Sequence, residues 1–320
     1  MKALVTGAAG FVGSNLSGRL LADGHDVVGI DIVTDYYDPT IKEGNLEKLH
    51  GEPNFTFLRE DLNEADLDTI LDGVDVVFHQ AGQPGVRSSW GHEFDLYTRA
   101  NIGATQRLLE AAVRNGSLSR FVYASSSSIY GNAESFPTRE DARPQPVSPY
   151  GVTKLAAEHL CSLYAQNFNL PTVSLRYFTV YGPGQRPDMA FTRFCKAAVT
   201  DGTITIYGQG KQIRDFTFID DVVEANVRAG TRSVAPGTVL NVAGGSNISV
   251  NEVLETIEGI HGAPLRIEYL DGVKGDVFRT GGDTTQIQEN LDWSPAVSLV
   301  DGLRSQYDWA KRVFGAHGGA

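Results

Sequence analysis

Cysteine is scarce in this chain, which has only Cys161 and Cys195 among its 320 residues. The two lie far apart, and neither belongs to a Cys-x-x-Cys or histidine-rich motif. This distribution predicts neither a disulfide framework nor a zinc site, and we expect no metal ligands. Both cysteines are expected to be reduced and to lie in or near the core.

Long apolar runs and an excess of basic residues are also missing. No apolar run is long enough to cross a bilayer. Met1-Lys2 leads directly into an apolar strand pattern, so we expect no signal peptide. The net charge is −12, with 27 Lys and Arg against 39 Asp and Glu, which argues against a nucleic-acid surface. We therefore expect a cytoplasmic protein with no membrane or nucleic-acid partner.

The overall composition, 41% hydrophobic and 21% charged residues, is typical of a soluble globular protein. Up to residue 176, strand patterns alternate with helix patterns, which predicts an α/β fold with a doubly wound parallel sheet. After Arg176 the chain becomes rich in glycine, proline and aromatic residues. We expect residues 1–176 to form a dinucleotide-binding domain and residues 177–320 mainly a smaller C-terminal α/β substrate domain. Residues 215–245 are expected to return to the first domain, beginning with a strand at 216–219 that rejoins the main sheet.

A glycine-rich turn follows the first predicted strand, 2–6, and opens a helix. Its Gly-x-x-Gly-x-x-Gly pattern lets the backbone approach a pyrophosphate at the helix N-terminus. The second predicted strand ends at Asp31, whose carboxylate is placed to bind the adenosine ribose diol and to repel a 2′-phosphate. The pattern therefore predicts NAD rather than NADP. The expected contacts of this unit are Gly7, Gly10, Phe11, Val12, Gly13 and Asp31.

The ends of later strands are expected to complete the cofactor site. The strand predicted at 55–58 leads to Asp61 and Leu62 near the adenine, and the strand at 74–78 leads to small residues that let the backbone pass the cofactor. A helix predicted at 94–115 carries Asn101. His79 is interpreted as a packed or locally bonded histidine. The expected contacts are Asp61, Leu62, Gln80, Ala81, Gly82 and Asn101.

A cluster of hydroxyls, Ser125 to Ser128, follows a buried strand pattern at 121–124. It is therefore placed at the carboxyl end of a strand, where open α/β sheets bind ligands. Further on, Ser148 is a suitable N-cap and Pro149 suits the first turn of a helix. Tyr150 and Lys154 then lie four residues apart on one face of that helix.

The Tyr150–Lys154 pair has the chemistry of a proton acceptor, because a nearby ammonium favours the phenolate. A serine hydroxyl is able to bridge that tyrosine to a substrate oxygen. Taken alone, a Tyr-x-x-x-Lys pair is more often a solvated helix face, and a serine run is more often a loop. Their joint occurrence after a dinucleotide-binding turn favours catalysis.

Arginines collect in the second half of this acidic chain, at Arg176, Arg186, Arg193 and Arg214. Together they are a candidate phosphate or carboxylate pocket. For any one of them, a solvated surface arginine is an equally good interpretation.

The glycine turn, Asp31, Ser126, Tyr150 and Lys154 together resemble the extended short-chain dehydrogenase/reductases, in the NAD-dependent epimerase/dehydratase group. The likeness covers essentially the whole chain. It implies an NAD-binding Rossmann domain followed by a smaller nucleotide-sugar domain. It also implies Tyr150 as the proton-transferring residue, Ser126 as its partner, Lys154 as the ligand of the nicotinamide ribose, and Tyr177 as a further cofactor contact.

Within that group, positions where this chain differs from particular members reduce the number of candidate substrates. Sugar-nucleotide 4,6-dehydratases and UDP-glucuronate decarboxylases carry acidic residues where this chain has Ser127 and Ser128. UDP-galactose 4-epimerases commonly have asparagine where Thr179 stands. The segments 36–38, 84–88 and 179–191 most resemble UDP-glucuronate 4-epimerases.

This resemblance implies an NAD-dependent isomerase that inverts C4 of UDP-glucuronate to UDP-galacturonate through a 4-keto intermediate. Arg186, Arg214 and Arg279 are expected to bind the diphosphate or ribose, with Asp276 as a ribose partner. The expected substrate contacts are Val86, Ser126, Ser127, Ser128, Tyr150, Thr179, Arg186, Met189, Phe191, Arg214, Asp276 and Arg279.

Alternatives stay open on the sequence alone. They are a 4-epimerase of UDP-glucose or UDP-N-acetylglucosamine, a UDP-glucuronate decarboxylase, and a non-catalytic NAD-sensing protein. A binding module would have no use for the Ser126, Tyr150 and Lys154 set. The resemblance further implies a homodimer whose interface is a four-helix bundle formed by helices 94–115 and 149–168 of both copies.

Overall fold

The computed structural model describes residues 1–271 and 277–315. Its centre is a seven-stranded parallel sheet with the strand order β11-β6-β5-β4-β1-β2-β3. The strands are β1 Lys2–Thr6, β2 Asp26–Ile30, β3 Phe55–Leu58, β4 Val76–His79, β5 Arg120–Ser126, β6 Thr172–Tyr177 and β11 Thr238–Val242. This is the doubly wound arrangement that the alternating pattern predicts.

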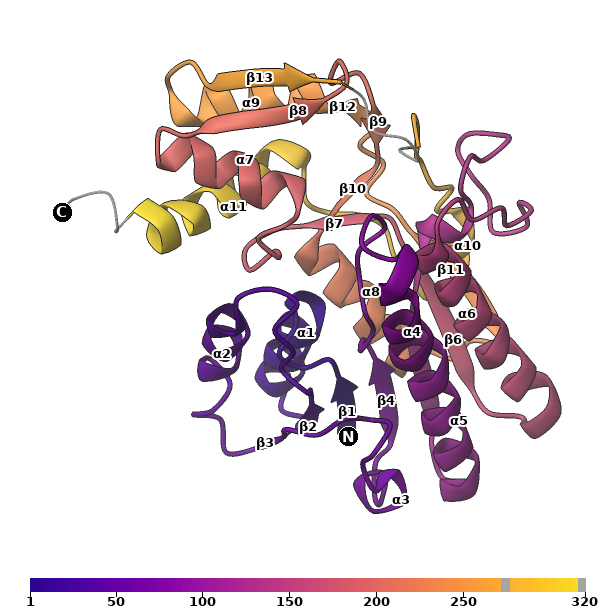
Figure 1. Ribbon diagram of the computed structural model, residues 1–320. Helices are drawn as coiled ribbons and strands as arrows, with labels where there is room; N and C mark the ends of the chain where they lie inside the picture. Colours follow the sequence, from indigo (N-terminus) through magenta and orange to yellow (C-terminus); the bar gives the residue numbers. More distant parts are fainter. Residues whose placement is uncertain (272–276, 316–320) are drawn as a thin grey trace.

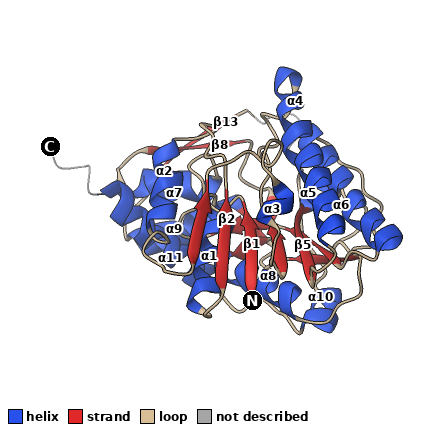
Figure 2. Ribbon diagram, turned by 90° about the horizontal axis from the view of Figure 1, so that it is seen from below, coloured by secondary structure: helices blue, strands red, loops and turns tan. Residues whose placement is uncertain are grey.

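Helices cover both faces of the sheet (Figures 1 and 2). On one face α1 (Phe11–Ala22) packs against α8 (Ile219–Thr231), and on the other α5 (Ala104–Asn115) packs against α6 (Pro149–Phe168). Successive strand residues alternate between the two layers. Val5, Phe78 and Val122 belong to the core beneath α1 and α8, whereas their neighbours Leu4, Val77, Phe121 and Tyr123 belong to the core beneath α5 and α6.

The C-terminal part forms a second layer above the sheet in Figure 1. There α7 (Ala190–Val199), α9 (Val250–His261) and α11 (Leu299–Phe314) pack together beside a parallel pair, β8 (Thr203–Tyr207) and β13 (Arg266–Leu270). The remaining elements are α2 Pro39–Glu47, α3 Leu67–Ile70, α4 Phe94–Tyr97, β7 Thr179–Tyr181, β9 Ile213–Arg214, β10 Phe216–Phe218, β12 Ile248–Ser249 and α10 Thr285–Leu291.

The strand predicted at 216–219 does not rejoin the main sheet, so that prediction is wrong. It is β10, which pairs with β7 in a separate two-stranded sheet, and β11 is the strand that joins the main sheet beside β6. The physical reason is a bond between segments distant in the sequence: the N–H of Thr179 donates to the carbonyl of Asp215 at 3.1 Å, at the start of the β7–β10 pairing.

The helix predicted at 94–115 is interrupted. It comprises α4, a π-helical segment at Thr98–Gly103 and α5, and Asn101 lies in the π segment. Wide turns of this kind occur often at functional sites. The N-cap prediction for α6 is confirmed, since the Ser148 hydroxyl accepts from the N–H of Gly151 and Pro149 occupies the first turn.

Candidate active site

The glycine turn forms a cradle between β1 and α1. A Cβ at position 13 would lie 2.1 Å from the carbonyl oxygen of Gly7, and one at position 7 would lie 2.8 Å from the nitrogen of Ala81. The N-cap of α1 is Gly10, which has no side chain to accept from the first helical N–H groups. These donors suit a pyrophosphate, so the residues present fit the dinucleotide that the sequence predicts. Phe11 and Val12 form the first turn of α1.

Asp31 follows β2 directly beside this cradle. Its carboxylate accepts from the N–H of Ala9 at 3.1 Å and of Val33 at 2.7 Å, and it lies 4.0 Å from the ammonium of Lys42. These bonds fix the acid next to the glycine turn. Lys42 is itself buried and donates to Thr34, a contact that sequence reasoning missed.

The segment after β4 passes close to Lys154. A Cβ on Gly82 would lie 2.9 Å from the Asn101 amide oxygen and 3.9 Å from the Lys154 ammonium. Asn101 also binds both backbone groups of Gln83 and the hydroxyl of Thr153, which ties the π segment to α6. The small residue at position 82 therefore lets the segment after β4, the π segment and α6 approach one another closely.

His79 is a packed residue, as expected. Its two ring nitrogens bond Thr6 at 2.7 Å and Thr105 at 2.9 Å. Burial lowers its pKa to about 3, with a smaller contribution from the charge of Lys154. The histidine is therefore neutral and lies behind the site.

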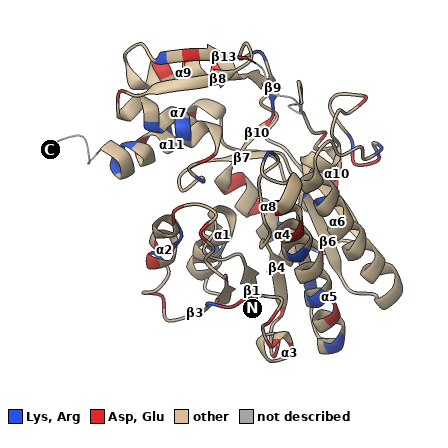
Figure 3. Ribbon diagram, in the orientation of Figure 1, with Lys and Arg blue, Asp and Glu red and all other residues tan. Residues whose placement is uncertain are grey.

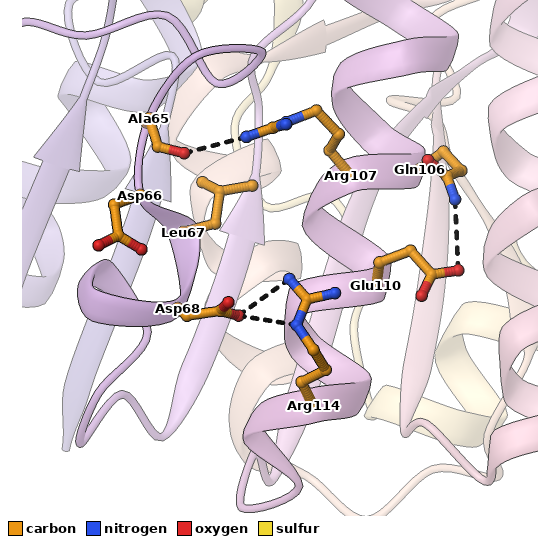
Figure 4. Close-up of a pocket in the computed structure, with 8 residues that line it drawn as sticks. All are labelled: Ala65, Asp66, Leu67, Asp68, Gln106, Arg107, Glu110 and Arg114. Atoms are coloured by element: carbon orange, nitrogen blue, oxygen red, sulfur yellow. Dashed lines mark hydrogen bonds and ion pairs between the residues drawn. The ribbon is translucent and has the colours of Figure 1, made fainter.

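Arginines of the α5 region hold the chain around Asp61 and Leu62, the segment expected near the adenine. Figure 4 shows two of these arginines, Arg107 and Arg114, where they meet the residues just after that segment. Arg107 donates to the carbonyls of Leu62 and Ala65 at 3.1 and 3.0 Å, and Arg114 pairs with Asp68 at 2.9 Å. Arg99, in the π segment, pairs with Asp61 at 3.0 Å. These bonds position Asp61 and Leu62 at the sheet edge.

The serine cluster forms a short turn at the end of β5. The Ser126 hydroxyl accepts from the N–H of Ser128 at 3.1 Å, and a single 3₁₀ turn spans Ser127–Ile129. This turn packs on the start of α6, where a Cβ on Gly151 would lie 2.6 Å from the Ser128 carbonyl oxygen. Glycine at position 151 therefore lets the serine turn lie directly beside Tyr150.

Tyr150 faces the serine turn from the first turn of α6. Burial raises its pKa, and a hydrogen bond with Ser126 and the charge of Arg186 oppose this effect. Its ring meets that of Tyr97 edge to face, with centroids 6.3 Å apart. The arrangement gives the tyrosine a hydroxyl partner and a nearby cation, which are the two features that favour proton removal.

Lys154 lies one turn further along α6 and is buried, 6% exposed. Its ammonium lies 4.5 Å from the centre of the Tyr123 ring. Burial lowers its pKa to about 8, against the raising effects of Cys161 and Glu158. The lysine is thus a cation held beneath the site by an aromatic ring.

The loop after β4 is hydrogen-bonded to Tyr97, the residue whose ring packs against Tyr150. The Tyr97 hydroxyl bonds the carbonyls of Pro84 and Gly85 and the hydroxyl of Ser88, which in turn bonds Tyr36 at 3.1 Å. Val86 at the tip of this loop is 37% exposed. The Tyr36-Tyr37 pair in the sequence was a signal for this contact.

Arg87, in the same loop, reaches the C-terminal layer. Its guanidinium lies 5.0 Å from the centre of the Tyr207 ring on β8. Sequence reasoning assigned no site role to Arg87. The contact joins the loop after β4 to β8 of the C-terminal layer.

The arginines do not converge as one pocket. Arg186 pairs with Asp188 at 2.8 Å and lies over the Tyr36 ring at 5.8 Å, and its charge acts on Tyr150. Arg193 is exposed on α7. Arg176 is buried in an ion pair with Glu158 at 2.7 Å, so its interpretation as a ligand arginine is wrong.

Arg214 and Arg279 lie close together in the C-terminal layer. Residue 279 is joined to β9 by a bridge with Ile213, and the Arg214 side chain donates to the carbonyl of Phe278 at 3.2 Å. The Arg279 guanidinium lies 4.9 Å from the Phe136 ring. Asp276 lies outside the described residues.

Four other residues predicted to contact cofactor or substrate differ in how much of their surface is exposed. The Tyr177 hydroxyl donates to the Gln80 amide oxygen at 3.0 Å and to the Asn226 amide oxygen at 2.9 Å, so it is held by two side chains. Thr179 and Met189 are partly exposed. Phe191 is 1% exposed and its ring packs on Phe216, so it presents almost no surface to a ligand.

Fold and site together define a nucleotide-binding α/β enzyme, and residues 3–243 match the model of the NAD dependent epimerase/dehydratase family. The chain belongs to this family. It is 45% identical to a Bacillus subtilis protein described as an uncharacterized UDP-glucose epimerase, YtcB, over 98% of this chain and 99% of that protein. It is 38% identical to a UDP-glucuronate 4-epimerase of Thermodesulfobacterium geofontis, over 96% and 95%.

A solved structure shows the same likeness. The crystal structure of a UDP-glucuronic acid 4-epimerase from Bacillus cereus, in complex with UDP-glucuronic acid and NAD, superposes with a TM-score of 0.94 at 45% identity. The match covers 98% of this chain and all of that one.

Proposed function

We propose that this protein is an NAD-dependent isomerase that inverts C4 of UDP-glucuronate to give UDP-galacturonate. The observation that carries the proposal is the serine turn: it packs on the start of α6 beside Tyr150, where Ser126 opposes the rise in the Tyr150 pKa, and the two positions after Ser126 hold hydroxyls instead of a carboxylate. Relatives that act on UDP-glucuronate, with sequence identity reaching 45%, support the choice of substrate.

The proton steps fall to Tyr150. NAD, when bound, would supply reversible hydride chemistry at C4 of the sugar, with no net consumption over a turnover. The residues that would hold it are the glycine turn, Asp31 and Lys154. Tyr150 takes the proton of the 4-hydroxyl as the carbonyl forms, with Ser126 as its hydrogen-bond partner, and returns that proton after the sugar has turned within the pocket.

The absence of an acid next to Ser126 determines which chemistry follows. Water elimination across C5–C6 needs an acid/base group there, and Ser127 and Ser128 cannot supply one. The hydroxyls of Ser127, Ser128 and Thr179 are instead donors for the glucuronate carboxylate. The 4-keto intermediate is a β-keto acid, so the site must hold that carboxylate out of alignment with the carbonyl to prevent loss of carbon dioxide.

The cations divide into two groups in this proposal. Arg186 acts on Tyr150, which favours a place at the sugar end over the diphosphate end expected from the sequence. Arg214 and Arg279, which lie together in the C-terminal layer, are the proposed diphosphate or ribose ligands. The proposed substrate domain is accordingly 177–320, apart from the part of 215–245 that returns to the NAD-binding domain.

A second candidate is a 4-epimerase of UDP-glucose. Neutral hydroxyls at 127, 128 and 179 would also bind a hydroxymethyl group, and the B. subtilis relative carries the name of a UDP-glucose epimerase. The test is kcat/KM for UDP-glucuronate, UDP-glucose and UDP-N-acetylglucosamine, with products identified by NMR. A preference for UDP-glucuronate supports the proposal, and a preference for either neutral sugar replaces it.

We also propose a homodimer formed through the helices of the α4–α6 region. Lys154 and Glu158, the two Asp, Glu, Lys or Arg residues of α6, are both buried, so its outer surface carries no such charge (Figure 3). Large apolar side chains are exposed on this side, namely Trp90, Phe94, Leu96, Val152, Leu163 and Phe168. Light scattering of wild type and Leu163→Asp tests this: the variant is expected to be monomeric.

No helix in the described part of the chain is both long and apolar enough to span a bilayer. We propose the cytoplasm as the site of action, because both cysteines are buried free thiols whose pKa burial raises. Cell fractionation tests this location.

A further inference from the structure

Behind the catalytic residues lies a buried ion pair that the reaction above does not use. The Glu158 carboxylate accepts two bonds from the Arg176 guanidinium, at 3.0 and 2.7 Å, and a third from the Ser125 hydroxyl at 2.6 Å. Glu158 is 2% exposed and Arg176 is 5% exposed. The pair is therefore almost completely removed from water.

The position of Glu158 relates it to the chemistry. It lies four residues after Lys154 and eight after Tyr150 in α6, so the three share one side of the helix. Its partner Ser125 directly precedes Ser126 at the end of β5. Glu158 thus joins the helix that carries the base and the lysine to the strand that carries the serine turn.

The other end of the serine turn is bound to the same pair. Arg176 donates to the Tyr130 hydroxyl at 2.6 Å, and Tyr130 closes the turn as its C-cap. Both ends of the turn, Ser125 and Tyr130, are therefore attached to one Glu158–Arg176 unit. The hydroxyls between these ends are the ones proposed to meet the 4-hydroxyl and the carboxylate of the sugar.

The network also reaches the loop that carries Arg279. Tyr130 donates to the Asn241 amide oxygen at 2.7 Å, and the Asn241 amide nitrogen donates to the carbonyls of Thr138 and Asp283. Thr138 pairs with the backbone of Gly281 at 2.7 Å. Polar bonds thus run continuously from the expected diphosphate side to the serine turn.

Stability alone is a weak reason for such a pair. Well-packed apolar residues of similar volume often stabilise a fold as well as a buried ion pair does, or better. A set of bonds with fixed geometry, in contrast, specifies one arrangement of the groups it joins.

Glu158 is also the anion that faces Lys154. The other titratable groups around this ammonium are Cys161 on α6, Tyr123 on β5 and His79 on β4. Burial raises the pKa of Cys161 and Tyr123 and lowers that of His79, so these three groups are uncharged near neutral pH.

From this geometry we infer that Glu158 is a positioning residue: with Arg176 it holds the serine turn in register with Tyr150 and Lys154, and so keeps the sugar carboxylate from leaving as carbon dioxide. The part of this inference that concerns carbon dioxide rests on the proposed function. The part that concerns the register of Tyr150 and Lys154 applies to any C4 epimerisation in this site.

The test compares three variants. Glu158→Gln removes the charge and keeps the shape. Ser125→Ala removes the hydrogen bond from Ser125 to Glu158 and keeps the Glu158–Arg176 ion pair. It therefore replaces Glu158→Gln in the test if that variant folds poorly. The matched control is Asp221→Asn, another buried carboxylate, which accepts from the N–H groups of Ala296 and Val297 in a different part of the core.

For Glu158→Gln we expect kcat to fall ~100-fold, the scale for a misplacement of about 1 Å, with KM changed much less. The alkaline limb of the kcat–pH profile should move to lower pH, because Lys154 loses its facing anion. Carbon dioxide released per turnover of UDP-glucuronate should rise. Ser125→Ala should shift kcat and carbon dioxide release in the same directions, and Asp221→Asn should shift neither.

Equal kcat, pH limb and carbon dioxide release in wild type and Ser125→Ala would overturn the inference. So would losses in Glu158→Gln that Asp221→Asn reproduces at equal thermal stability. If wild type converts another UDP-sugar and leaves UDP-glucuronate unchanged, the proposed function fails. The same kcat and pH comparison on that sugar then still decides the role of Glu158.

Discussion

The Cα of Gly13 lies so close to Gly7 that a Cβ at position 13 would be 2.1 Å from the Gly7 carbonyl oxygen. Gly7 itself has φ +70° and touches Ala81. The first turn of α1, the glycine turn and the segment after β4 are therefore in direct backbone contact. This contact brings the N-terminus of α1 to the cofactor side of the sheet.

Gly13→Ala should therefore strongly weaken NAD binding, because the turn must open to admit the methyl group. We expect the dissociation constant to rise by about 100-fold or more, which corresponds to ~3 kcal/mol. Isothermal titration measures it. The control is Gly259→Ala on the exposed side of α9, where nothing lies within 4 Å of the added Cβ. There we expect a gain of ~0.5–1 kcal/mol in unfolding free energy and unchanged NAD binding. A Gly13→Ala protein that binds NAD like wild type would contradict the account of the cradle.

Arg87→Ala should weaken substrate binding more than it slows turnover. Its guanidinium holds the loop beside Tyr97 to the Tyr207 ring of β8. A cation–π contact contributes ~0.5–2 kcal/mol, so KM for the UDP-sugar should rise by about 2–30-fold. Steady-state kinetics measures this. Tyr207→Phe keeps a ring and should behave like wild type, whereas Tyr207→Leu should match Arg87→Ala. Equal KM values for the Phe and Leu variants would rule out the ring contact.

His79 makes the fold less stable in acid. Its pKa is lowered in the folded state to about 3, from an ordinary 6.5. Its contribution to the unfolding free energy is therefore complete above the unfolded pKa and is lost as the pH falls from there toward the folded value. At a pH ~1.5 units below the unfolded pKa the loss is ~2 kcal/mol. Urea unfolding at neutral pH and at about pH 5 should show this loss in wild type and not in His79→Gln. The same pH dependence in both proteins would mean that other groups cause it.

Asp215 has the opposite effect on the pH dependence of stability: it makes the fold less stable as the pH rises. Burial raises its pKa from 3.8 to about 6, despite bonds from the N–H groups of Gly245 and Gly282. Its stabilising contribution is complete below the unfolded pKa and disappears as the pH rises through about 6, a change of ~3 kcal/mol at most. Asp215→Asn lacks this titration. Its unfolding free energy, relative to wild type, should therefore increase between about pH 4 and neutral pH. A constant difference across that range would refute the assignment.

Much of this fold follows from local sequence signals. The glycine turn, the strand that ends at Asp31 and the cap at Ser148 each depend on residues close together in the chain. The sheet partner of Phe216–Phe218 does not. The alternation Phe-Thr-Phe indicates a strand, but the choice of β7 over the main sheet depends on the distant bond between Thr179 and Asp215.

The site divides in the same way. Ser126, Tyr150 and Lys154 were predictable because their spacing and order carry the chemistry. Glu158 was not, because a glutamate on a helix usually indicates a solvated face. Its burial depends on Ser125 and Arg176, which approach it from two separate strands. For the same reason Arg176 was grouped with ligand arginines, although its partner lies inside the protein.

The central claim is that this site inverts C4 without consuming NAD, and proton NMR of UDP-glucuronate incubated with the protein and NAD tests it most directly. We predict that UDP-galacturonate forms and reaches equilibrium with the substrate with no net NADH, and that Tyr150→Phe forms none. UDP-xylose with released carbon dioxide in place of UDP-galacturonate, or full activity in Tyr150→Phe, would contradict the account.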